Sequence, residues 1–154
     1  METEILSEIQ KPVVIRELQV KYKSRKRVKS LRMDCPKSVW EFCRKLIGNN
    51  VQESMLALYL DNKNNLIGYS VVSTGTISET IVHPRECFLV GISMAASGLV
   101  LVHNHPSQEL TPSREDITTT TRIVEAGRIL GIALLDHVIV SCEGFYSMLE
   151  NGHL

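Results

Sequence analysis

The sequence predicts an α/β protein in which helices cover a central sheet. Three segments carry helix signals, which are apolar residues at helical spacing or proline and glycine at the segment ends, and they alternate with four short apolar segments that are typical of strands. The predicted strands are residues 54–60, 66–73, 99–102 and 132–140. The predicted helices are residues 36–47, 85–97 and 112–130. Strands that alternate with helices in this way are typical of layered α/β domains.

The first predicted helix begins at Pro36, because proline is favoured in the first turn of a helix. Val39, Cys43 and Ile47 recur at helical spacing along one face. Gly48 then ends the helix, since glycine is common just beyond a helix C-terminus.

The second predicted helix, residues 85–97, follows Pro84 and ends before Gly98. It is apolar on most sides, which predicts a central position in the fold. The third predicted helix starts at Thr111-Pro112 and is ended by Gly131.

The strand segments differ in how they are predicted to be covered. Residues 54–60 and 66–73 flank a polar turn at residues 61–65, which predicts a hairpin. Residues 99–102 form a continuous apolar run, as expected of a strand that is covered on both faces. The sheet is therefore predicted to be central.

Length and composition are those of one ordinary globular domain. The chain has 154 residues, of which 44% are apolar and 22% are charged; this excludes disordered, collagen-like and coiled-coil chains. No apolar run reaches the ~18 residues that span a bilayer, and residues 1–10 lack the features of a secretory signal. The four cysteines form no C-x-x-C pair, which favours a reduced, cytoplasmic protein with buried thiols.

Positive charge is concentrated at the N-terminus. Residues 1–32 hold nine of the 17 Lys and Arg residues but four of the 17 Asp and Glu residues. We therefore expect a basic arm or hairpin at residues 1–34, followed by the main domain at residues 35–154. Basic residues 11–32 predict either contact with nucleic acid or an acidic partner, or a solvated edge strand whose charges block aggregation.

The residues that carry chemistry lie after the strand at 99–102. His103 and His105 are two residues apart, so on an extended chain both imidazoles point to the same side. Asp116 follows in the opening turns of the third predicted helix, with Ser113 one turn earlier on the same face. A strand end and the following helix start face each other across a crevice where α/β folds bind ligands.

Two imidazoles and a carboxylate are a ligand set that zinc (Zn²⁺) accepts, with a fourth position left for water. A hydrolase would also need a base to move the proton, for which Glu53, Glu79 and Glu86 are all candidates on composition alone. Ser113 is a candidate for hydrogen bonding to a developing oxyanion, although a serine there is equally typical of helix capping.

The string His103-x-His105-x7-Ser113-x2-Asp116, preceded by Glu53, resembles the JAMM motif of JAB/MPN-domain metalloproteases, and the wider sequence resembles their RadC-type branch. The resemblance covers about residues 35–150. It implies a cytidine-deaminase-like fold with a mixed sheet between helices, zinc held by His103, His105 and Asp116, Glu53 as acid/base, and Ser113 as the group stabilising the tetrahedral intermediate. Gln108 departs from the pattern, because the RadC-type loop usually has glycine there.

The resemblance implies a zinc-dependent hydrolase of amide or isopeptide bonds in a peptide or protein substrate. A DNA-associated RadC-like module with a structural metal, or a metal-dependent nuclease, are the alternatives. The sequence lacks the H-x-E and P-C-x-x-C signatures of zinc deaminases, which disfavours base deamination. His83 is interpreted as local structure at a helix start. Asp136-His137 is interpreted as a polar pair that supports a strand end, and the alternative is that the pair supports the metal ligands or contacts the substrate.

Overall fold

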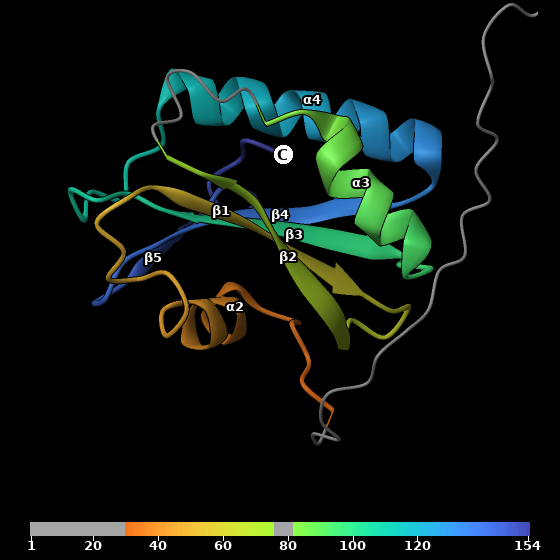
Figure 1. The fold of residues 1–154 in the computed structure, drawn as a ribbon, viewed down its shortest axis with the longest axis horizontal. Helices are drawn as coiled ribbons and strands as arrows, with labels where there is room; N and C mark the ends of the chain where they lie inside the picture. Colours follow the sequence, from red (N-terminus) through yellow and green to blue (C-terminus); the bar gives the residue numbers. More distant parts are fainter. Residues whose placement is uncertain (1–29, 76–81) are drawn as a thin grey trace, which may run out of the picture.

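The computed structural model describes residues 30–75 and 82–154 (Figure 1). The basic segment of residues 1–29 and the candidate base Glu79 lie outside these ranges. The elements in chain order are α2 (Pro36–Cys43), β1 (Ser54–Leu60), β2 (Leu66–Thr74), α3 (Pro84–Ser93), β3 (Gly98–Asn104), α4 (Arg114–Leu130), β4 (Ala133–Val140) and β5 (Phe145–Ser147).

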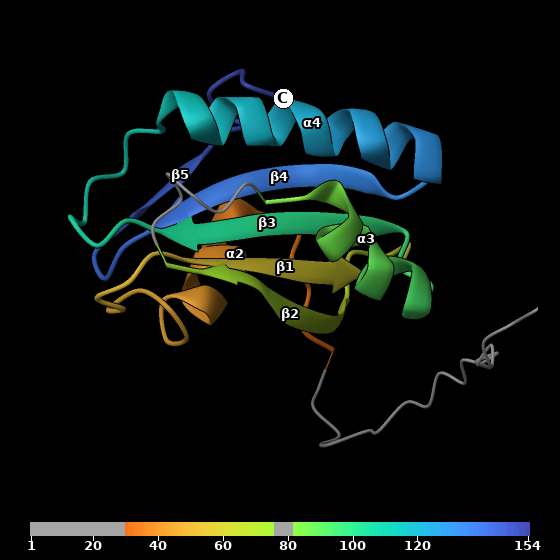
Figure 2. The same cartoon turned by 45° about the horizontal axis from the view of Figure 1, so that its top comes forward.

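The strands form one five-stranded mixed sheet in the order β2-β1-β3-β4-β5 (Figure 2). β1 pairs antiparallel with both β2 and β3, whereas β3 and β4 are parallel neighbours connected through α4. Helices α3 and α4 cover one face of the sheet and α2 covers the other (Figure 1). The predicted α/β class, with a mixed sheet between helices, is therefore confirmed.

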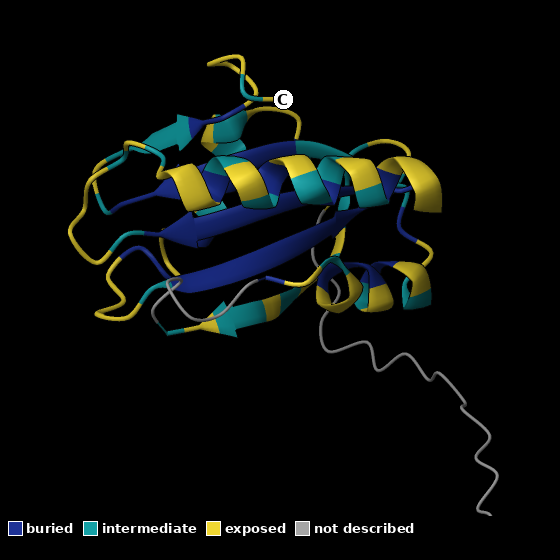
Figure 3. Ribbon diagram, turned by 90° about the horizontal axis from the view of Figure 1, so that it is seen from above, coloured by how far each residue is buried: buried dark blue, intermediate teal, exposed yellow. Residues whose placement is uncertain are grey.

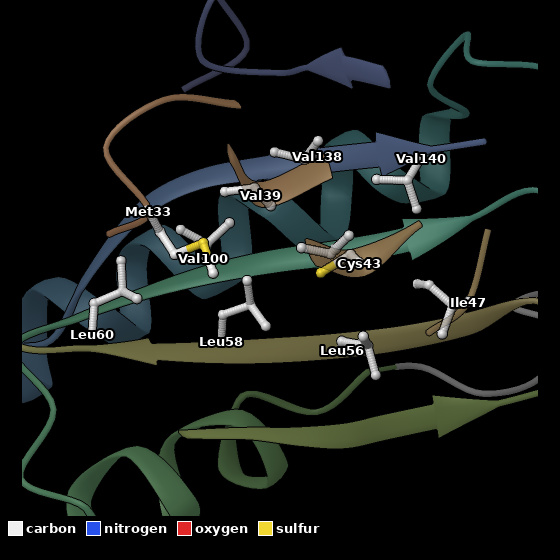
Figure 4. Packing of buried hydrophobic residues seen from close by; sticks show 11 residues of the cluster. Met33, Val39, Cys43, Ile47, Leu56, Leu58, Leu60, Val100, Val138 and Val140 are labelled. Atoms are coloured by element: carbon white, nitrogen blue, oxygen red, sulfur yellow. The ribbon is translucent and has the colours of Figure 1, made fainter. Parts of the chain in front are cut away.

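Two apolar clusters hold these layers together. Under α2, the side chains of Val39 and Cys43 face Leu56, Leu58 and Val100 on the sheet (Figure 4). On the opposite face, residues of β1 and β3 pack against α3 and α4. Every residue of β1 and β3 is buried (Figure 3), as the continuous apolar run predicts. This burial makes the two strands a fixed platform for the side chains at their ends.

The strand β3 is longer than predicted. It continues through His103, which pairs with both β1 and β4, and through Asn104, which pairs with β4. His103 is therefore a strand residue and not a loop residue, and its side chain has the fixed direction that a central strand imposes.

The predictions for α3 were wrong in two respects. The helix ends at Ser93, because Ala95 adopts a left-handed φ of 51°. The amide of Ala95 donates to Ile92 O and that of Ala96 donates to Gly91 O, which is a Schellman motif without its usual glycine. The helix also lies at the surface and not centrally, with Leu89 58% exposed.

An irregularity in β4 decides which of its side chains face the side of the sheet that α3 and α4 cover. Leu99 pairs with Leu134 but Val100 pairs with Asp136, so Leu135 is an extra, bulged residue. The bulge shifts the alternation of β4 by one residue. His137 then shares the face of Leu101, which belongs to the cluster under α3 and α4.

The structure also contains one short strand that the sequence patterns did not predict, β5. It pairs antiparallel with β4 at the edge of the sheet. Among the described residues, no helix is long and apolar enough to cross a bilayer.

Candidate metal centre

Four side chains converge at one end of the sheet. His103 lies near the end of β3, His105 follows it directly, and Asp116 lies in the first turn of α4. Glu53 immediately precedes β1, whose Met55 is paired with His103. Because side chains two residues apart share a face, this register brings Glu53 to the same site. One ligand atom from each of the four residues lies within 4.8 Å of all the others.

The distances within this group match what one small cation needs. His103 Nε2 lies 2.9 Å from His105 Nε2 and 3.2 Å from Asp116 Oδ1, and His105 Nε2 lies 3.5 Å from Asp116 Oδ2. Ligands at ~2.0–2.1 Å around a tetrahedral zinc ion are about 3.3 Å apart. Glu53 Oε1 is farther away, at 3.9 Å from His103 Nε2. The geometry therefore separates three candidate ligands from one neighbouring carboxylate.

The hydrogen bond on the far side of His105 makes its inner nitrogen an acceptor. His105 Nδ1 lies 2.7 Å from the carbonyl oxygen of Glu109. A carbonyl only accepts, so Nδ1 carries the proton, and in the neutral ring Nε2 presents a lone pair to the site. Lone pairs and carboxylate oxygens that face one another repel unless a cation or a proton lies between them. The four residues therefore fit a divalent metal ion.

The electrostatics of the group are consistent with this. The nearby Asp116 carboxylate favours a proton or a cation beside His105, and so raises the pKa of His105, although partial burial opposes the shift. Burial raises the pKa of Asp116, but its contacts with the imidazoles of His103 and His105 outweigh that effect and hold the pKa well below its usual range. Asp116 therefore remains a carboxylate, the form that binds metals.

Ser113 is the N-cap of α4. Its hydroxyl donates to Asp116 Oδ2 at 2.7 Å and accepts from the Asp116 amide at 3.1 Å, and its own amide also donates to Oδ2 at 2.7 Å. These bonds form a capping box in which aspartate takes the place of the usual glutamate. In this structure Ser113 therefore orients the carboxylate of Asp116; its predicted contact with an oxyanion stays a prediction.

Asn104 was not predicted from the sequence, although it holds the chain segment that carries Glu53. It is fully buried; its Oδ1 accepts from the Ser54 amide at 2.9 Å, and its Nδ2 donates to Asn50 O at 3.1 Å. The only sequence signal was its place between the two histidines. Because alternate residues of a strand face opposite sides, Asn104 points away from the imidazoles and anchors the neighbouring loop.

The other candidates from the sequence lie elsewhere. Glu86 pairs with Arg85 on the surface. His83 is the N-cap of α3 and accepts from the Arg85 amide at 3.1 Å, which confirms its interpretation as local structure. Asp136 faces the α2 side, where it accepts from the Ser147 hydroxyl at 2.7 Å. His137, in contrast, lies directly behind His103, with 2.8 Å between their nitrogens.

Gln108 has a left-handed backbone, with φ 63°. It ends a turn in which its amide donates to His105 O at 2.9 Å. Its side chain donates to Gly48 O at 3.2 Å and accepts from the Cys142 amide at 3.1 Å. Glycine, the residue that the resemblance leads one to expect here, adopts a left-handed φ without steric cost. Here glutamine takes that conformation and its side chain joins the loops at Gly48 and Cys142.

A mixed α/β sheet with two histidines and an aspartate gathered at a strand end defines a candidate metal-binding domain of the JAB class. The profile of the RadC-like JAB domain matches residues 33–153, and the chain belongs to this family.

Several curated relatives are similar to the chain. UPF0758 proteins of Desulforamulus reducens, Bacillus cereus strain B4264 and Thermotoga maritima are 43%, 41% and 41% identical to it. The alignments cover 77%, 90% and 80% of this chain and 52%, 60% and 55% of the relatives. The chain thus spans little more than half the length of these relatives.

Proposed function

We propose that this domain is a zinc-dependent hydrolase of the JAMM type that cleaves an amide or isopeptide bond in a peptide or protein. The observation that carries the proposal is the convergence of His103, His105 and Asp116 with Glu53 beside them. A purely structural metal site would be closed by a fourth ligand, whereas a catalytic site keeps one position open. Membership in the RadC-like JAB family supports the same reaction class.

In this proposal His103, His105 and Asp116 hold the ion. When bound, zinc supplies a Lewis acid that polarises a carbonyl oxygen and acidifies water. Glu53 takes the proton from the attacking water and returns it to the leaving amine, a role that suits a carboxylate close to the ligands but outside their shell. Ser113 can serve the oxyanion once its hydroxyl turns away from Asp116.

Two substitutions test these roles. Glu53→Gln keeps the size and hydrogen-bonding capacity of the side chain but removes the base, so it should retain zinc and lose hydrolysis. His105→Ala should lose both, because a ligand is gone. The assay combines zinc analysis of purified protein with digestion of peptide and isopeptide libraries. Loss of zinc in Glu53→Gln would make Glu53 a ligand, and full zinc retention in His105→Ala would remove the basis of the site.

A second candidate function is association with DNA, including metal-dependent hydrolysis of phosphodiesters. It is favoured by the concentration of cations in residues 1–32. Replacing Lys21, Lys23, Arg25 and Arg27 together with Gln should then abolish salt-dependent binding to duplex DNA. Absence of wild-type binding at low salt would reject this candidate, and a nuclease assay with and without chelator separates it from peptidase activity.

A further inference from the structure

We propose that His137 is a positioning residue that fixes the tautomer and the ring orientation of His103, so that His103 Nε2 is the atom presented to the metal. This inference rests on the proposed metal site. It is carried by a chain of buried hydrogen bonds that runs from the backbone of α4 through Thr120 and His137 to His103.

The donor and acceptor roles along this series of hydrogen bonds follow from its first bond. Thr120 Oγ1 lies 2.7 Å from the carbonyl oxygen of Asp116. This carbonyl and the sulfur of Met148, at 3.3 Å, are the acceptors near the single hydroxyl hydrogen of Thr120, and the carbonyl oxygen, which is closer and the stronger acceptor, takes it. The hydroxyl oxygen of Thr120 lies 2.7 Å from His137 Nδ1. Because its hydrogen is already used, the hydroxyl accepts here, and His137 Nδ1 carries a proton.

The remaining bonds are then determined as well. A neutral His137 with a proton on Nδ1 has a lone pair on Nε2. His103 Nδ1 lies 2.8 Å from that nitrogen and must donate to it. The lone pair of His103 is therefore on Nε2, which faces His105 and Asp116. His137 is fully buried, and its two nitrogens face a hydroxyl and an imidazole, neither of which carries a negative charge, so the uncharged ring is the favoured form.

The position and burial of this hydrogen-bond chain indicate that it orients His103 and does not merely fill the core. His103, Thr120 and His137 are all fully buried, so none of their polar atoms can exchange partners with water. His137 reaches this face of the sheet because the bulge at Leu135 shifts the alternation of β4. Asp116 is part of both ends of the arrangement: its carbonyl starts the chain, and its carboxylate faces His103 Nε2. The chain thus couples two candidate ligands from different elements.

Four variants of the full chain test the inference through zinc affinity, measured by competition with a chromophoric chelator. His137→Leu removes the acceptor, and we expect zinc to bind about 10–100-fold more weakly. His137→Gln should restore part of the loss, because its amide oxygen can accept from His103 while its nitrogen donates to Thr120. Thr120→Val frees the tautomer of His137 and should give an intermediate loss.

Thr121→Val is the matched control. The Thr121 hydroxyl makes the same kind of bond to a carbonyl one turn earlier, that of Ile117 at 3.1 Å, but the residue is exposed and contacts no imidazole. Its zinc affinity should equal that of the unchanged chain. Thermal melts of the zinc-free variants establish that each one is folded, and they separate a loss of affinity from a loss of stability.

The ring nitrogens of the zinc-free protein give a readout that needs neither metal nor activity. Two-dimensional ¹H–¹⁵N NMR of the imidazoles should show protons on Nδ1 of His103 and of His137, and none on Nε2 of His137. Unchanged zinc affinity in folded His137→Leu, or a proton on His137 Nε2, would overturn the inference. If the chain binds no zinc, the proposed function fails, whereas the NMR result still decides the tautomers.

Discussion

Gln108 provides a sharp test of how the loop that carries His105 is held. Two effects oppose each other at this residue: its left-handed φ of 63° is strained, while its side chain makes two hydrogen bonds. Substitution with Ala removes the hydrogen bonds and keeps the strain. Substitution with Gly removes the hydrogen bonds and the strain together.

The expected free energies follow from these terms. Two hydrogen bonds of an exposed side chain contribute about 0.5 kcal/mol each, so Gln108→Ala should lower the free energy of unfolding by ~1 kcal/mol. Glycine avoids ~1–2 kcal/mol of left-handed strain but adds ~0.5–1 kcal/mol of chain entropy to the unfolded state. Gln108→Gly should therefore be ~0.5–1 kcal/mol more stable than Gln108→Ala.

Urea denaturation of the three proteins in a chelator-containing buffer measures this order, with the exposed Gln52→Ala as control. A difference of 1 kcal/mol also corresponds to a shift of about 2–4 °C in Tm for a chain of this size. The reasoning is refuted if Gln108→Gly proves less stable than Gln108→Ala, since the backbone argument requires the opposite order.

Two further predictions concern titrating groups. The pKa of His105 is raised above its ordinary value of 6.5, so the contribution of His105 to the stability of the zinc-free protein should be lost as pH rises above 6.5. The pKa of His137 is lowered, so the contribution of His137 should be lost as pH falls below 6.5. Urea midpoints measured from pH 5 to 9 should thus be highest near pH 6.5. A midpoint that keeps rising above pH 6.5 would contradict the His105 assignment, and one that keeps rising as the pH falls below 6.5 would contradict the His137 assignment. Burial raises the pKa of Cys43 and Cys87 to about 12. A thiol reagent at pH 8 should therefore label the exposed Cys35 but neither Cys43 nor Cys87 before unfolding. Rapid labelling of Cys43 or Cys87 would contradict this prediction and show that the core opens locally.

Much of the fold could be predicted because its signals are local. Pro36 marks the start of α2 and Gly131 the end of α4, each through its own backbone preference. The apolar run at residues 99–102 indicates a strand that is buried on both faces. The same applies to part of the site. His103 and His105 share a side because of strand alternation, a property of the chain itself.

What could not be predicted depends on pairing between distant segments. Glu53 reaches the histidines only because Met55 is paired with His103, and no local pattern encodes that register. His137 faces the site only because Leu135 is bulged, and regular alternation would have turned it away. The early end of α3 could not be predicted for another reason: Ala95 occupies the left-handed position after the helix, where glycine is the usual residue and the usual sequence signal.

The central claim is that His103, His105 and Asp116 bind one metal ion. X-ray absorption spectroscopy of zinc-loaded protein, combined with metal analysis, tests it most directly. We expect one zinc per chain, with two imidazole nitrogens and oxygen ligands at ~2.0–2.2 Å. Sulfur in the zinc shell, a single imidazole, or a spectrum that is unchanged in His105→Ala would contradict the account.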